Sequence, residues 1–296
     1  MKKIGVIGSI NMDLTALSER IPSPGETVSA KELKRVPGGK GANQAVAAAR
    51  LGACVSMFGC VGDDVFAGEL LDNLRQNRVD TSGIERVQGT SSGVALIVVS
   101  QGENAITVVP GANARVSPEY IRAQSVRILE NDIVLLQNEI PLETVYAAAK
   151  MLHENGKTVI YNPAPALKAD KKLLDLCSFI TPNEHEVRLL YGNDSAPIEQ
   201  LVESAGGRLI VTLGSKGVIG CDSEGLFAIP AIDARVTDTT GAGDTLNGAF
   251  ACALSLGMGV RDALIFANAA AGISTEKYGA QGGMPGMDEV LARIKH

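Results

Sequence analysis

The residues Asp238-Thr239-Thr240-Gly241-Ala242-Gly243-Asp244-Thr245 carry the strongest signal in this 296-residue chain. They follow an extended segment at 234–237 and open an apolar helix that we predict over Gly243–Leu256. The two glycines allow a tight turn whose backbone N–H groups point outward at the positive end of the helix dipole. Such donors form a ready anion site, which would stabilise a phosphoryl group that gathers charge during its transfer.

This turn matches neither of two familiar phosphate-binding loops. The P-loop pattern GxxxxGK[ST] is absent, and Leu246 stands where a Rossmann fingerprint needs its third glycine.

Asp244 has two interpretations. Spacing alone favours an Asp that caps the helix, which is a common role. The alternative is a catalytic base for an alcohol. A helix N-terminus weakens such a base by favouring its charged form, but phosphoryl transfer tolerates this because positioning supplies most of the catalysis.

A second glycine-rich turn, Gly38-Gly39-Lys40-Gly41-Ala42-Asn43, precedes another predicted helix. Its glycines allow a ligand to approach the backbone closely. Lys40 adds a cation, and Asn43 adds a paired donor and acceptor, which suits sugar hydroxyls because they both give and accept hydrogen bonds. The alternative is a flexible turn with a solvated lysine, and this short motif alone does not decide between the two.

Short β-branched runs alternate with Ala- and Leu-rich stretches along much of the chain. Buried strands are predicted at Ile4–Ile10, Val55–Val61, Ile133–Gln137, Thr158–Asn162, Phe179–Thr181 and Leu209–Thr212. Helices are predicted at Gly41–Leu51, Ala67–Asn77, Leu142–Glu154, Asn183–Tyr191, Gly243–Leu256 and Val260–Thr275. This alternation predicts an α/β fold with a mostly parallel sheet, helices on both faces and ligands beyond the carboxyl ends of the strands.

Residues 12–36 and 90–108 depart from that pattern, with polar alternation and turns. The segment 91–113 predicts a hairpin with Gln101-Gly102-Glu103-Asn104 at its tip. We therefore expect a small antiparallel sheet that projects from a body made of 1–11, 37–89 and 109–296. A lid over the ligand and a simple edge extension of the main sheet both remain open as interpretations.

Composition narrows the class of protein. Apolar residues make up 45% of the chain, enough for a sizeable core, and the net charge of −6 argues against a nucleic-acid partner, which would need a basic face. The five cysteines are odd in number and lack metal-ligand spacing, which indicates a reduced compartment and small buried side chains. No stretch has the length of a signal or membrane segment, so we expect a cytoplasmic protein without a membrane partner.

Taken together, these motifs resemble the ribokinase-like (phosphofructokinase-B type) sugar kinases over essentially the whole chain. The resemblance rests on GSINMD (8–13), PxPGETV (22–28), GGKGANQAVAAARLG (38–52), GDD (62–64), PGAN (110–113), NPAPA (162–166), TPNEHE (181–186), TLGSKG (212–217), DTTGAGDT (238–245) and KYGAQ (277–281). DTTGAGDT is highly specific for this superfamily. The resemblance implies a three-layer sandwich with a central, mostly parallel sheet and a small β-sheet lid that closes over the sugar.

The resemblance also implies roles for individual residues at the sugar. Asp244 resembles the base that faces the primary hydroxyl, and the N–H groups of Gly241, Ala242 and Gly243 resemble the anion hole. The implied sugar contacts are Asn11, Met12, Asp13, Gly39, Lys40, Gly41, Ala42, Asn43, Glu139 and Asp244. A carboxylate that accepts from two hydroxyls suits a cis-diol, which fits Asp13. Without the resemblance, Asp13 reads as a turn residue after a strand and Glu139 as a solvated residue before Pro141.

Further residues are implied to bind ATP and metal ions. The implied nucleotide contacts are Asn183, Thr212, Leu213, Gly214, Ser215, Lys216, Gly217, Gly243 and Asn268. Asn183 and Glu186 lie three apart, and in the family this pair organises Mg²⁺ through water; a capping box is the alternative, and both roles are compatible. Asn268 is alternatively a polar residue buried between helices.

The implied K⁺ ligands are Asp238, Thr240, Ser274, Lys277, Gly279 and Gly283. At Gly283 a relative has Ser, so a side-chain ligand is missing there.

The resemblance implies ATP-dependent phosphorylation of D-ribose at its 5-hydroxyl, giving D-ribose 5-phosphate and ADP, by a homodimer that pairs through the lid. A sister kinase for deoxyribose, fructose or a nucleoside remains open, although the absence of Trp and the 4% aromatic content disfavour a stacked base slightly. A catalytically silent sugar or nucleotide sensor is a third possibility. The intact Asp244 beside an intact Gly-Ala-Gly argues against a sensor, which would not need the base.

Overall fold

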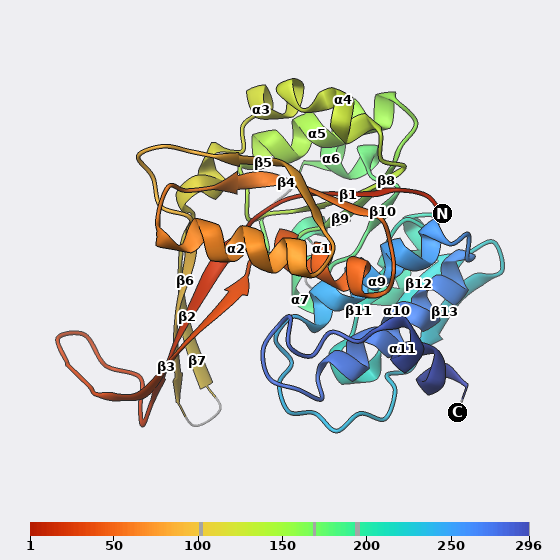
Figure 1. Ribbon diagram of the computed structural model, residues 1–296. Helices are drawn as coiled ribbons and strands as arrows, with labels where there is room; N and C mark the ends of the chain where they lie inside the picture. The colour runs from red at the N-terminus through yellow and green to blue at the C-terminus, as the bar shows by residue number, and fades with distance from the viewer. Residues whose placement is uncertain (101–102, 168–169, 193–195, 296) are drawn as a thin grey trace.

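The computed structural model describes residues 1–100, 103–167, 170–192 and 196–295. Its centre is a parallel sheet of six strands in the order β10-β9-β8-β1-β4-β5. These strands are β1 (Ile4–Ile7), β4 (Val55–Val61), β5 (Asp80–Arg86), β8 (Ile133–Gln137), β9 (Thr158–Asn162) and β10 (Phe179–Ile180). Figure 1 shows helices on both sides of this sheet, which makes three layers.

The helices alternate with the strands along the chain. They are α1 (Lys40–Arg50), α2 (Val65–Gln76), α3 (Pro118–Ala123), α4 (Ser125–Leu129), α5 (Leu142–Glu154), α6 (Lys171–Leu176), α7 (Glu184–Tyr191), α8 (Ile198–Ser204), α9 (Ala242–Ser255), α10 (Val260–Ser274) and α11 (Met287–Ile294). Two short 3₁₀ turns are η1 (Gly111–Arg115) and η2 (Gly214–Lys216).

The core has two halves, one on each face of the sheet. Along β8, Ile133 and Leu135 pack on the side of α1, α9 and α10, whereas Val134 and Leu136 pack on the side of α5. Alternate side chains of a strand point to opposite faces, so a strand covered by helices on both faces must be apolar at every position. This is why the buried strands appear in the sequence as unbroken apolar runs.

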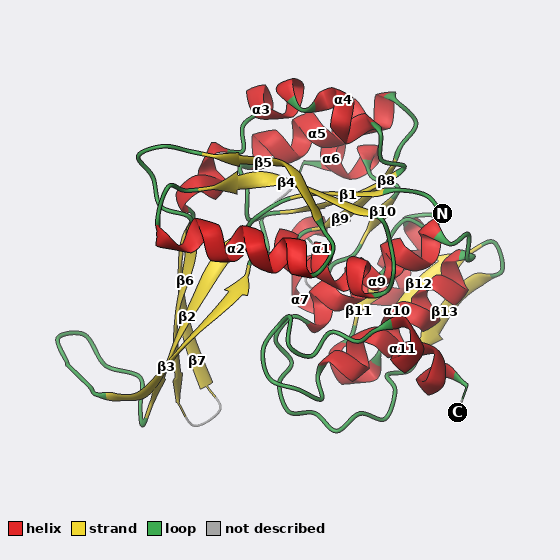
Figure 2. Cartoon of the chain, viewed as in Figure 1, coloured by secondary structure: helices red, strands yellow, loops and turns green. Residues whose placement is uncertain are grey.

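A second sheet of four strands lies apart from the six-stranded sheet, in the order β3-β2-β6-β7 (Figures 1 and 2). Its strands are β2 (Asn11–Ser18), β3 (Ala30–Gly38), β6 (Gly93–Ser100) and β7 (Glu103–Val109). β2 is antiparallel to β3 but parallel to β6, so the sheet is mixed and the prediction of a wholly antiparallel sheet is wrong. β6 and β7 form the predicted hairpin. Of the four predicted tip residues, Gln101 and Gly102 lie outside the described residues, whereas Glu103 and Asn104 belong to β7, where they pair with Ser100 and Val99. Asn11, Gly38 and Gly93 stand in register at the root of this sheet, beside the body.

A third, antiparallel sheet contains β11 (Val211–Thr212), β12 (Val218–Asp222) and β13 (Gly225–Ile229). The strand predicted at Leu209–Thr212 is therefore shorter than expected and pairs in this sheet instead of the six-stranded one. Isolated parallel bridges from Ile180 to Leu209 and from Asn183 to Thr212 connect it with the end of β10. The sequence did not reveal the β12–β13 hairpin, nor did it reveal β5 and the helices α3, α4, α6, α8 and α11. All of these elements have eight residues or fewer, too few to show a clear periodicity.

The predicted α/β fold class is confirmed, and β4, β8, β9 and α5 have the predicted bounds. β1 is shorter than predicted, because the backbone beyond Ile7 leaves the sheet: Ser9 O accepts from Ala42 N, and Ile10 N donates to the side chain of Asn113. α2 begins earlier than predicted, at Val65, because the Asp64 side chain caps it.

Cys60, Cys177 and Cys252 are buried as expected, but Cys54 is exposed and Cys221 is half-buried, so the prediction of small buried side chains fails for two of the five. Among the described residues, none of the helices combines the length and apolar character that crossing a bilayer requires.

Candidate active site

Asp244 lies in the first turn of α9, and its side chain is buried, with 6% of the residue exposed. Gly241 directly precedes the helix, and its φ of 78° is in the left-handed region that glycine adopts without strain. The carboxylate does not cap the helix. One oxygen accepts from the amide of Asn43 and the other from the amide of Gln44, each at 3.0 Å. The helix-capping interpretation of Asp244, which spacing alone favoured, is therefore wrong.

The two glycine-rich turns of the sequence meet at this point, because α1 and α9 pack side by side. Gly248 lies one turn along α9 from Asp244, and a Cβ atom there would come within 2.6 Å of the backbone oxygen of Gln44. Only a glycine permits so close a contact. The close approach brings the first turn of α1, with Asn43 and Gln44, within hydrogen-bond reach of Asp244.

Buried amides surround the carboxylate on two sides. Gln44 also donates to Asn162 Oδ1 at 3.1 Å and accepts from Gln137 Nε2 at 2.7 Å. On the other side, Asn43 Oδ1 accepts from Gln281 Nε2 at 3.0 Å. These contacts use both ends of each amide of Asn43 and Gln44, so neither side chain is free to rotate. The carboxylate is thereby held in one orientation.

The candidate sugar residues lie at the root of the four-stranded sheet. Asn11 is buried, and its Oδ1 accepts from Asn113 Nδ2 at 2.6 Å. Asp13 follows two positions along β2, on the same face. Burial raises the pKa of Asp13 to about 7, and the negative charges of Glu139 and Asp244 act in the same direction, while Lys40 opposes them.

Glu139 is not the solvated residue that the sequence alone suggested. Its Oε2 atom accepts from the Ser9 hydroxyl at 2.6 Å and from the backbone N of Lys40 at 3.0 Å, so it satisfies an amide at the start of α1. The pKa of Lys40 is raised, mainly by the charge of Asp244; burial opposes this, and further carboxylates including Glu139 add to it. A charged Lys40 among carboxylates offers a cation to an incoming phosphate.

Asn183 and Glu186 form the capping box that the sequence suggested as an alternative role. Asn183 Oδ1 accepts from the backbone N of Glu186 at 2.8 Å, and Glu186 Oε2 accepts from the backbone N of Asn183 at 2.9 Å. Burial raises the pKa of Glu186. The capping bonds use a single oxygen of Glu186, which leaves the other oxygen able to hold a water of a magnesium ion.

The turn Thr212–Gly217 lies next to Asn183. Asn183 and Thr212 form a parallel bridge, and the Thr212 N–H donates to Pro182 O at 3.0 Å. Gly217 packs against the backbone at Ile229–Ala231, beside a cavity of about 480 Å³. Phe227, Ile229, Pro230, Ile232, Ile265 and Asn268 are among the residues that line this cavity. Asn268 itself is buried and donates to Pro230 O at 2.8 Å.

The residues proposed for K⁺ gather around the loop 275–283. Asp238 accepts from Thr240 N and from Gly279 N, each at 2.9 Å, and these bonds outweigh partial burial and lower its pKa. A Cβ atom at Gly283 would lie 1.9 Å from Ser274 O, so a serine there needs a shift of the backbone. The loop offers a carboxylate and backbone carbonyls, which are hard oxygen donors of the kind that fits K⁺. The Lys277 side chain instead forms an ion pair with Glu289 at 3.8 Å.

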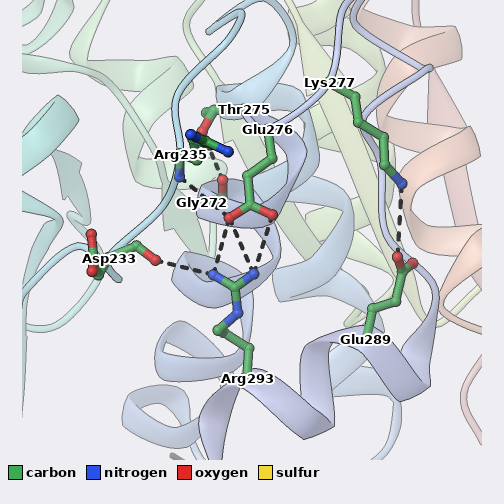
Figure 3. A network of polar contacts seen from close by, with 8 residues as sticks. All are labelled: Asp233, Arg235, Gly272, Thr275, Glu276, Lys277, Glu289 and Arg293. Carbon is green, nitrogen blue, oxygen red and sulfur yellow. Dashed lines mark hydrogen bonds and ion pairs between the residues drawn. The ribbon is translucent and has the colours of Figure 1, made fainter.

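The C-terminal helix supports this loop (Figure 3). Arg293 on α11 places both terminal guanidinium nitrogens within 3.1 Å of Glu276 and also donates to Asp233 O at 3.0 Å. Glu276 additionally accepts from the backbone N of Arg235 at 3.4 Å. One ion pair therefore joins α11, the segment 233–235 and the start of the loop.

Several polar residues of the site had no role predicted from the sequence. They are Ser9, Gln44, Asn113, Gln137, Asn162 and Gln281. All except Gln137 lie inside the quoted motifs, and the signal was the presence of hydroxyl and amide side chains in otherwise apolar or glycine-rich stretches. Gln137 closes an apolar strand, and its Oε1 atom is buried without a hydrogen-bond partner among the described residues.

The fold and this site define a family of kinases. A sequence model of the pfkB family of carbohydrate kinases matches residues 1–287, and the chain belongs to this family. It is 48% identical over 296 residues to a ribokinase of Lactococcus lactis, covering all of this chain and 98% of that protein. A deoxyribokinase of Salmonella typhi is 40% identical over 257 residues, 84% of each chain. An Arabidopsis thaliana ribokinase complexed with ribose and ATP superposes with a TM-score of 0.92 at 33% identity, over 100% of this chain and 99% of the other.

Proposed function

We propose that this protein phosphorylates D-ribose at the 5-hydroxyl with ATP, giving D-ribose 5-phosphate and ADP. The observation that carries the proposal is the Asp244 carboxylate, held by Asn43 and Gln44 at the positive end of α9. The relatives support ribose as the sugar: the chain is 48% identical to a ribokinase over its full length. A solved ribokinase with ribose and ATP has the same fold.

The geometry of α9 supports an in-line transfer of the phosphoryl group. The 5-hydroxyl oxygen attacks the γ-phosphorus, its proton passes to Asp244, and the bond to the β-phosphate oxygen breaks so that ADP leaves with the electron pair. The N–H groups of Gly241 and Gly243 stabilise the charge on the transferred group. The expected contribution of Ala242 is corrected, because its N–H donates to Thr239 O at 3.2 Å. The fixed orientation of Asp244 contributes by placing an acceptor for the proton before the sugar arrives.

The sugar site comprises Asn11, Met12, Asp13, the turn Gly39–Asn43 and Glu139. Asp13 accepts from two neighbouring hydroxyls of ribose, and Asn11 and Asn43 supply amides to the others. Glu139 acts partly through α1, because it binds the backbone N of Lys40. The site thus combines acceptors and donors in the mixture that a polyhydroxylated ligand needs.

ATP lies along the turn Thr212–Gly217, with its base in the apolar cavity beside Asn268 and its phosphates directed to Asn183, Lys40 and Gly243. When bound, Mg²⁺ neutralises phosphate charge during transfer. Glu186 would hold it through a water, since one of its oxygens is not used by the capping box. Asp238, Thr240, Ser274, Lys277, Gly279 and Gly283 would hold K⁺, with backbone carbonyls in the main role at the positions other than Asp238.

The four-stranded sheet acts as a lid over the sugar and as the surface of a cytoplasmic homodimer. The sequence pattern assigns residues 12–36 and 90–108 to this lid, which joins the body at 11–12, 36–37, 89–90 and 108–109. Several large apolar side chains of this sheet are exposed, among them Leu33 (70%), Leu96 (47%) and Ile106 (53%). Such a concentration of apolar surface on one element is typical of a surface that a partner covers.

A panel assay tests the proposal. ADP release is measured with pentoses, hexoses and nucleosides, with and without K⁺, and we expect the highest kcat/KM for D-ribose. 2-Deoxyribose is the second candidate, since a deoxyribokinase is 40% identical over 84% of this chain. A preference for 2-deoxyribose, fructose or a nucleoside would replace ribose as the substrate, and the absence of ADP with every sugar would overturn the kinase proposal.

A further inference from the structure

A continuous row of side-chain amides runs from Arg50 to Asp244. Arg50 Nε donates to Asn77 Oδ1 at 2.8 Å, and Asn77 Nδ2 donates to the Asn73 backbone oxygen at 2.8 Å and, over 3.5 Å, to Asn73 Oδ1. Asn73 Nδ2 then donates to Gln281 Oε1 at 2.8 Å. The row continues from Gln281 Nε2 to Asn43 Oδ1 and from Asn43 Nδ2 to Asp244 Oδ2, both at 3.0 Å.

The direction of every bond in this row is fixed by its two ends. A guanidinium group can only donate, so the oxygen of the Asn77 amide must face Arg50. An ionised carboxylate can only accept, so the nitrogen of Asn43 must face Asp244. Asn43 then turns its oxygen to Gln281, and Gln281 turns its own oxygen to Asn73. Each amide has one orientation that satisfies both neighbours, and bonds aligned in this way strengthen one another.

Gln281 occupies the central place in the row. Its residue is 4% exposed, and its side chain joins α2 to α1 at the point where α1 touches Asp244. The loop that carries Gln281 has separate support: an Arg50 terminal nitrogen donates to the backbone oxygens of Gln281 and Met284. The side-chain amide of Gln281 is therefore available to orient Asn43 while other bonds hold the loop.

We propose that Gln281 is a positioning residue for phosphoryl transfer, which fixes Asn43 in the orientation that donates to Asp244. This inference rests on the proposed function. It goes further by adding to the site a residue that touches neither sugar nor nucleotide. Loss of the amide leaves the buried oxygen of Asn43 without its donor, so Asn43 can rotate and Asp244 loses one of its two constraints.

The first test compares Gln281→Met, which keeps the length and removes both polar atoms, with Gln281→Glu, which can only accept. Glu forces Asn43 to turn its nitrogen away from Asp244, so its effect should be the larger. We expect kcat with ribose to fall about tenfold in Gln281→Met and further in Gln281→Glu, with KM for ATP within about twofold of wild type. Asn131→Ala is the matched control: its amide is buried at 1% exposure and, among the residues that the structure describes, bonds only to Arg127 O and Ile128 O. Its kcat should not change.

A double-mutant cycle separates positioning from a general loss of structure. If Gln281 acts through Asn43, then Gln281→Met should change kcat less than twofold in the Asn43→Ala background. An equal loss in both backgrounds, or an unchanged kcat in Gln281→Met, would overturn the inference. Wild-type turnover in the same assay tests the kinase proposal separately.

An NMR measurement tests the positioning role of Gln281 without turnover, so its outcome does not depend on which sugar is the substrate. The side-chain amide of Asn43, assigned in ¹⁵N-labelled protein with the help of Asn43→Ala, should shift and exchange faster with water in Gln281→Met. It should remain unchanged in Asn131→Ala. An Asn43 amide that is the same in wild type and Gln281→Met would overturn the positioning role.

Discussion

Asn43 and Asp244 stand 201 positions apart in the chain, yet the amide of one donates to the carboxylate of the other at 3.0 Å. Gln44 holds the second carboxylate oxygen at the same distance. Two adjacent residues of α1 thus fix both oxygens of a side chain on α9. A general base oriented before its substrate binds loses less entropy in the transition state, so this contact links the packing of two helices to the proposed chemistry.

Asp244→Asn should remove most of kcat while ribose and ATP still bind. The amide cannot take the hydroxyl proton, and the loss of a positioned base costs about 10²- to 10⁴-fold in rate. Calorimetric titrations with each ligand and steady-state assays measure the two effects. Asp262→Asn is the control, because Asp262 lies in the first turn of α10 but is exposed. Near wild-type turnover in Asp244→Asn would show that another group acts as the base.

Ribose binding should strengthen as the pH rises through about 7. The pKa of Asp13 is raised to about 7 by burial and nearby carboxylates, so below that pH the side chain carries a proton and accepts from hydroxyls poorly. Calorimetry between pH 6 and 8 should show a dissociation constant that falls by about tenfold. In Asp13→Asn the dependence should disappear and binding should be weak throughout. A wild-type affinity that is flat over this range would contradict the role of Asp13.

The same carboxyl group should make the free protein less stable at higher pH. The unfolded chain releases the Asp13 proton near the ordinary aspartate pKa of 3.8, whereas the folded protein keeps it up to a pKa of about 7. Between these values the folded state binds more protons, so the free energy of unfolding falls as pH rises, by about 2 to 4 kcal/mol from this group. Urea unfolding should therefore find Asp13→Asn more stable than wild type at pH 8, with little difference at pH 4.

Arg293→Met should destabilise the protein and weaken ATP binding. The ion pair with Glu276 has both partners about one-third exposed or less, and it fixes the loop beside the proposed nucleotide cavity. We expect a loss of about 1 to 2 kcal/mol and a higher KM for ATP, with KM for ribose unchanged. Glu289→Gln breaks the neighbouring, more exposed pair with Lys277 and should cost less than 0.5 kcal/mol. Similar effects of both changes in thermal unfolding would argue against the special role of Arg293.

Gly283→Ser should destabilise the protein rather than supply a cation ligand. Its Cβ atom would lie 1.9 Å from Ser274 O, so the loop must move by more than a few tenths of an ångström. We expect a loss of about 2 kcal/mol or more and no gain in activation by K⁺. Gly68→Ala on α2 is the matched control: its Cβ meets nothing within 4 Å, and it should stabilise the helix by up to about 1 kcal/mol. Enhanced K⁺ activation in Gly283→Ser would show that the loop adapts.

Local sequence patterns alone determined much of the secondary structure of this protein. The strands β4, β8 and β9 and the helix α5 have the predicted bounds, because an apolar run between turns or an amphipathic stretch is a local property of the chain. The glycine-rich turns at 38–43 and 238–245 likewise predict anion and sugar binding from local residue types, since glycine permits close backbone approach there. Asn183 and Glu186 showed a capping box through their spacing of three residues.

Only the tertiary structure decided which of two interpretations held at Asp244. Spacing favoured a helix cap, whereas in the fold α9 has no side-chain cap and the two Asp244 oxygens accept from Asn43 and Gln44. The same is true of Glu139, which satisfies the start of α1 instead of facing water, and of Gln281, whose amide reaches Asn43 across 238 positions. The physical reason is that a polar side chain takes its role from the partner it meets when buried. Contacts between residues so far apart in the chain exist only after the helices have packed.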